Sequence, residues 1–108
     1  AWFGVALLVV VAASPAAEER ANGHVLLARC LDERNPGTCL NELIIVADMH
    51  DVVAAWGLGQ SQWCMPENAP PERLRSAILA YLQADGRDLD EPSSRLIAAA
   101  YAEAFPCR

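Results

Sequence analysis

The residues that could do metal, redox or nucleophilic chemistry are few in this sequence of 108 residues. The soft ligands are four cysteines and two histidines, namely Cys30, Cys39, Cys64, Cys107, His24 and His50. The cysteines are widely spaced and form no CxxC pair, the arrangement that zinc sites and thiol oxidoreductases commonly use. In an exported chain of this size, four such cysteines favour two structural disulfides over a zinc site or a redox centre.

Four cysteines allow three pairings. We favour Cys30 with Cys39, because one predicted helix ends at Cys30, the next begins at Cys39, and only a short loop separates them. Cys64 then pairs with Cys107 by elimination, which would tie the C-terminus to a central loop.

None of the histidines or cysteines has the neighbours that catalysis requires. His50 lies between Asp48 and Asp51, but successive residues of a helix point apart, so we expect a solvated face there and no metal or acid–base cluster. We expect His24 to be structural or exposed. Cys64 lacks the base and the orienting group of a thiol nucleophile. The sequence therefore predicts neither an enzyme nor a cofactor.

The charge balance excludes several classes of partner. Aspartate and glutamate number 14 against eight arginines and no lysine, so the net charge is −6. An acidic chain is a poor ligand for nucleic acid or anionic lipid. The acids of loops and helix starts are suited to helix dipoles and solubility, and some could steer a basic partner. They are Glu67, Glu72, Asp85, Asp88, Asp90 and Glu91.

Residues 1–16 have the pattern of a signal peptide whose start is truncated. The run is apolar and uncharged, and the small residues Ser14 and Ala16 suit positions −3 and −1 of a cut after Ala16. A buried N-terminal helix is the alternative interpretation. A cleaved signal peptide predicts a periplasmic protein without stable membrane insertion.

The rest of the chain, residues 17–108, has the periodicity of one small all-α domain. Four helices are predicted, over residues 18–31, 39–56, 70 to about 85, and 91–104. Thr38 is the expected N-cap of the second helix. The apolar positions of that helix are so many that we expect much of it to be buried between the others.

A candidate partner-binding patch flanks the central loop. Its residues are Trp56, Gln60, Gln62 and Trp63. Exposed tryptophans anchor many protein interfaces. The alternative, which we favour for both tryptophans, is that their rings cap the helical core.

The order of the motifs resembles that of the Rap1a/Tai immunity proteins. Cys30 near the end of an exported helix is followed by Cys39 at the start of a long helix, then Cys-Met-Pro at 64–66 and Tyr-Leu at 81–82. The last helix ends in Ala-Phe-Pro-Cys at 104–107. The resemblance covers residues 19–108.

This resemblance implies a small, all-helical, often dimeric periplasmic protein. Such a protein would block a cognate type VI secretion effector, for example a peptidoglycan amidase, by covering its active site. The expected partner is that secreted enzyme, and a homodimer is a further expectation. The alternatives are a periplasmic chaperone of the acid-stress type and an exported helical protein with an unknown ligand.

Overall fold

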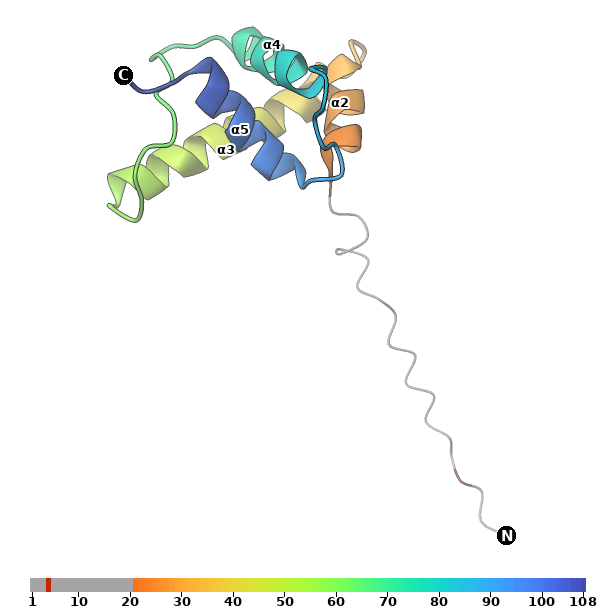
Figure 1. Cartoon of the computed structure of the whole chain (residues 1–108), viewed down its shortest axis with the longest axis horizontal. Helices are drawn as coiled ribbons and strands as arrows, with labels where there is room; N and C mark the ends of the chain where they lie inside the picture. The colour runs from red at the N-terminus through yellow and green to blue at the C-terminus, as the bar shows by residue number, and fades with distance from the viewer. Residues whose placement is uncertain (1–3, 5–20) are drawn as a thin grey trace.

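The computed structural model describes Gly4 and residues 21–108, and those residues form four α-helices (Figure 1). The helices are α2 (Gly23–Leu31), α3 (Pro36–Ala55), α4 (Pro71–Leu82) and α5 (Ser93–Ala104). Each of them packs against the other three, which makes one bundle. The prediction of a small all-α fold with four helices is confirmed. The predicted signal peptide lies outside the described residues, Gly4 excepted.

Helix α2 begins later than the predicted start at residue 18, since neither Ala21 nor Asn22 is helical. The Asn22 side chain caps the helix by accepting the Val25 N–H at 3.1 Å. The preceding backbone is held extended, because the Ser93 N–H donates to the Ala21 carbonyl at 2.9 Å. The first turns of α2 and α5 therefore lie side by side.

Helix α3 begins earlier than predicted, and Thr38 is not its N-cap. Asn35 occupies the N-cap position and Pro36 is the first helical residue. Proline suits this place because its φ is already helical and its missing N–H would have no partner there. The Thr38 hydroxyl instead donates to the Asn35 carbonyl at 3.1 Å.

Side chains of all four helices meet in the core. Its fully buried members include Leu26, Leu43, Ile78, Leu96, Ile97 and Tyr101. The Tyr101 hydroxyl donates to the Leu43 carbonyl at 2.8 Å, which joins α5 to α3. Burial raises the pKa of this hydroxyl above its ordinary value.

Gly23 allows α2 to approach the α4–α5 connection closely. A Cβ atom at this position would lie 2.6 Å from the Leu96 side chain and 2.9 Å from the Leu89 backbone. Such distances are shorter than any real Cβ contact, so only glycine fits here without a shift of the backbone.

Two disulfides join the segments, as predicted, and the pairing is the one favoured from the sequence. Cys30–Cys39 is buried and links the end of α2 to the start of α3. Cys64–Cys107 is exposed and links the α3–α4 loop to the C-terminus. The Cys64 N–H also donates to the Phe105 carbonyl at 2.8 Å.

The prediction that much of the long helix is buried is wrong. Only Cys39 and Leu43 of α3 are buried. Helix α3 has 20 residues whereas α4 and α5 have 12 each, so at 1.5 Å per residue α3 is about 12 Å longer than either neighbour. Its C-terminal half reaches past the other helices into solvent (Figure 1).

Candidate functional site

Four large apolar side chains form a line from the middle of α3 to its C-cap. We call this line the outer stripe, and it consists of Ile45, Met49, Val52 and Trp56. They are 61, 56, 39 and 74% exposed. Steps of four, three and four residues place them on one helix face, away from the core residue Leu43. Exposed apolar surface of this extent is typical of a protein interface.

The backbone after α3 makes a tight, hydrogen-bonded stop. Gly57 has a φ of +70°, in the left-handed region. The Gly57 N–H donates to the Ala54 carbonyl at 3.1 Å, and the Leu58 N–H donates to the Val53 carbonyl at 3.0 Å. These two bonds are those of a Schellman motif. The motif gives the exposed tip of α3 a defined shape.

His50 holds the returning loop against α3. Its Nε2 accepts the Gln62 N–H at 3.0 Å, and its ring stacks on the Trp63 ring with 3.8 Å between centroids. Its Nδ1 lies 3.5 Å from an Asp51 carboxylate oxygen. The expectation of a solvated face is therefore wrong for His50, because the loop folds back over the imidazole. Asp48 and Asp51 are exposed, as expected.

The structure separates the four residues of the predicted partner patch. Trp56, Gln60 and Gln62 are exposed. Trp63 is only 5% exposed and packs edge-on against Tyr101, with 5.3 Å between the ring centroids. Trp63 therefore belongs to the core, and the prediction that it contacts a partner is wrong. The preferred core interpretation holds for Trp63 and is wrong for Trp56.

Sequence reasoning missed Ile45, Met49 and Val52 as surface residues, because it assigned the excess of apolar positions in this helix to the core. A usable signal was present. The spacing of these three residues and Trp56 defines a second apolar face, distinct from the face that carries Cys39 and Leu43.

A groove of about 400 Å³ lies between α3 and the segment that leads into α4. Leu74 and Met65 contribute apolar surface to its lining. Its exposed part carries three carboxylates, those of Asp48, Asp51 and Glu67. The groove thus combines apolar walls with negative charge.

The family model of the Rap1a immunity proteins matches residues 22–107. The chain belongs to this family. The match spans all four described helices and all four cysteines, and it confirms the resemblance inferred from the motifs. Membership in the Rap1a family implies neutralisation of a type VI secretion effector by a protein that is not an enzyme. No curated protein and no solved structure matches the chain.

The cysteine and histidine chemistry of this Rap1a protein is structural. All four cysteines are paired, so Cys64 offers no thiolate nucleophile. His24 is exposed, as expected, and lies 3.1 Å from Asp90. Within the part of the chain that the structure describes, no three metal-ligating side chains gather, and no helix is long and apolar enough to cross a membrane. The disulfides and the Rap1a family together indicate an exported protein.

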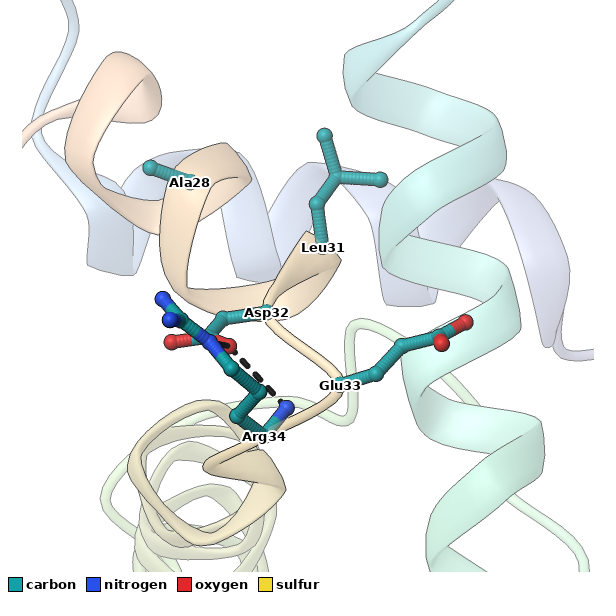
Figure 2. A pocket seen from close by; sticks show the side chains of 5 residues that line it. All are labelled: Ala28, Leu31, Asp32, Glu33 and Arg34. Atoms are coloured by element: carbon teal, nitrogen blue, oxygen red, sulfur yellow. Dashed lines mark hydrogen bonds and ion pairs between the residues drawn. The ribbon is translucent and has the colours of Figure 1, made fainter.

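A second hollow, of about 490 Å³, lies at the α2–α3 connection. Figure 2 shows its lining, in which the Arg34 side chain turns back onto Asp32. The Arg34 Nε lies 3.3 Å from the Asp32 carboxylate, and the Arg34 N–H donates to it at 3.0 Å. Within residues 21–108, this pair leaves Glu33 as the one carboxylate of the hollow's lining outside an ion pair, whereas the groove beside α3 carries three carboxylates.

Proposed function

We propose that this Rap1a protein binds a peptidoglycan amidase effector in the periplasm and blocks its active-site cleft. Family membership supports neutralisation of an effector. An amidase effector suits an exported inhibitor best, because the substrate of the amidase is the cell wall, which lies outside the cytoplasm. On this proposal residues 1–16 are removed as a signal peptide after Ala16.

The outer stripe is the observation that carries this proposal. A tryptophan that is 74% exposed at the tip of a projecting helix is the kind of residue that anchors an interface. Gln60 and Gln62 lie on the adjoining loop, where they would supply polar contacts around this anchor. Inhibition would then be steric and would need no reaction by this chain.

The projecting surface is held in shape before any partner arrives. The Schellman motif fixes the end of α3, the Gln62 N–H is bound to His50, and the exposed disulfide fixes the far side of the loop. A surface ordered in advance loses less conformational entropy on binding. This supports a tight, rigid inhibitor over an adaptable chaperone.

The experiment is an amidase assay with purified type VI amidase effectors and peptidoglycan fragments as substrate. We expect one effector to lose activity at a one-to-one ratio with this protein. Trp56→Ala should weaken inhibition by about 30-fold, the effect of losing an interface hot spot. Leu31→Ala is the matched control, because Leu31 is also an exposed apolar residue but lies on α2. An effector that stays fully active with the wild-type protein, across the panel, would contradict the proposal.

A further inference from the structure

The outer stripe has the spacing of a helix-pairing seam. The steps from Ile45 to Met49, Val52 and Trp56 are four, three and four residues, which is the pattern of alternating seam positions in paired helices. We propose that the stripe seats one amphipathic helix of the effector, with basic residues along the flank of that helix. This inference rests on the proposed function and specifies the partner element.

The shape of the exposed surface favours a helix as the occupant. The stripe runs along about three turns of α3, or roughly 16 Å, and the partly exposed Val53 and the exposed Leu58 extend its apolar surface near the tip. A partner helix of similar length can place its own apolar side chains between those of α3. The stripe ends at Trp56, where the Schellman motif terminates α3, so the exposed seam has a defined end.

The negative charge beside the stripe indicates which residues should flank the apolar seam of the partner helix. Helix α3 carries the acids Glu42, Asp48 and Asp51 and has neither lysine nor arginine. Among the described residues, Asp48 takes part in no ion pair, and Asp51 pairs only with the adjacent His50. A second copy of α3 would set carboxylates against carboxylates, which is unfavourable across an interface. A helix with arginine or lysine beside its seam would be complementary.

The groove next to the stripe can receive such a basic side chain. The stem of an arginine or lysine is apolar and its head is charged. Met65 and Leu74 would contact the stem, and the carboxylates of Asp48, Asp51 and Glu67 would attract the head. The groove and the stripe share α3, so one helix could engage both.

The test uses two synthetic helical peptides and the full chain. Both peptides carry the same leucine seam, and the flanking positions are arginine in one and glutamate in the other. Binding is measured by anisotropy of the labelled peptide and by the emission of Trp56, with Trp56→Phe as the spectroscopic control. We expect the arginine peptide to bind at least about tenfold more tightly at low salt, with a smaller difference at high salt.

Charge variants test the assignment to named carboxylates. The double variant Asp48→Asn, Asp51→Asn should bring the two peptides to within about threefold of each other. The matched control is Glu33→Gln, Asp85→Asn, because both of these acids are exposed and neither lies on α3 or lines the groove. This control should keep the preference of the wild-type protein.

Three outcomes would overturn the inference. Equal affinity for the two peptides would exclude a basic flank. Failure of both peptides to bind the wild-type protein would exclude a helix as the occupant. A dimer in sedimentation that Met49→Glu disrupts would show that a second copy covers the stripe. The amidase assay is independent of all three. If the amidase is inhibited but the two peptides bind equally or not at all, this inference is wrong and the proposed function still stands.

Discussion

In the first half of α3 Cys39 and Leu43 are buried in the bundle, whereas the second half has no buried residue and carries Met49 and Val52 into solvent. The two halves belong to one continuous helix and are similarly apolar. They differ because α4 and α5 are too short to cover both. The comparison separates two roles along one helix, since the inner half stabilises the fold and the outer half offers surface to a partner.

The largest expected effect concerns the two disulfides, one buried at the start of α3 and the other exposed on the loop that follows α3. Replacing Cys64 and Cys107 by alanine should lower the free energy of unfolding by about 4 kcal/mol, since this bond closes a long loop. Under mild reductant, alkylation should label these two exposed cysteines before the buried Cys30 and Cys39. Urea unfolding and mass spectrometry measure the two effects. Earlier labelling of Cys30 would show that the buried start of α3 opens before the exposed loop, which would contradict the assignment of the inner half to the stable core.

Paired truncations on α3 should separate its halves directly. Leu43→Ala should cost about 3 kcal/mol of stability, because it leaves a cavity in the core. Met49→Ala should cost no more than about 0.5 kcal/mol, because its side chain is already in solvent. Urea denaturation of both variants gives the comparison. Similar losses for the two would mean that the outer stripe is covered in solution.

Gly23→Ala tests the close approach in the bundle. The added Cβ would clash with the Leu96 side chain and the Leu89 backbone, so we expect a loss of about 2 kcal/mol. Gly37→Ala is the matched control in a helix, because its Cβ would have only the Asn35 side chain near it, at 3.9 Å. That control should be neutral or slightly stabilising when both melting temperatures are measured. A Gly23→Ala variant as stable as the wild type would disprove the close approach.

Tyr101→Phe should cost about 1.5 kcal/mol near neutral pH, because the Leu43 carbonyl loses its hydroxyl partner. Burial raises the Tyr101 pKa in the folded state, whereas the unfolded value is about 10. The stabilisation is therefore complete below pH 10 and decreases above it, by about 1.4 kcal/mol per pH unit. Unfolding measured from pH 8 to 11 should show the wild type losing its advantage over Tyr101→Phe above pH 10. A constant difference across this range would refute the assignment.

Gly57→Ala gives the smallest expected loss, about 1 kcal/mol, since alanine is disfavoured at positive φ. The change should also disturb the tip of the outer stripe and so weaken effector binding. Gly59→Ala is the control, because its φ is not in the left-handed region and its Cβ would only meet Val53 at 3.4 Å. Calorimetry measures stability and binding for both variants. Equal binding by the two would show that the tip contributes little.

Local patterns predicted the helices well and their ends less well. The predicted start of the second helix at residue 39 is too late, because Pro36 is favourable in the first turn of a helix. The start of α2 depends on a backbone pairing with residues near the start of α5, which are far away in the sequence. No local pattern reports such a contact.

The candidate site was predicted only in part. Trp56, Gln60 and Gln62 are at the surface, but Trp63 is in the core, where it packs between His50 and Tyr101. The two tryptophans are chemically alike and seven residues apart, so residue type could not separate them. The return of the loop over His50 decides which ring is buried.

The sequence by itself determined the helical class, the two disulfides and the Rap1a family, because periodicity, cysteine spacing and short motifs are local properties of a chain. Only the tertiary structure decided that Ile45, Met49, Val52 and Trp56 face solvent. The physical reason is that burial depends on the reach of neighbouring elements. Two 12-residue helices cannot cover a 20-residue helix, however apolar its far end is.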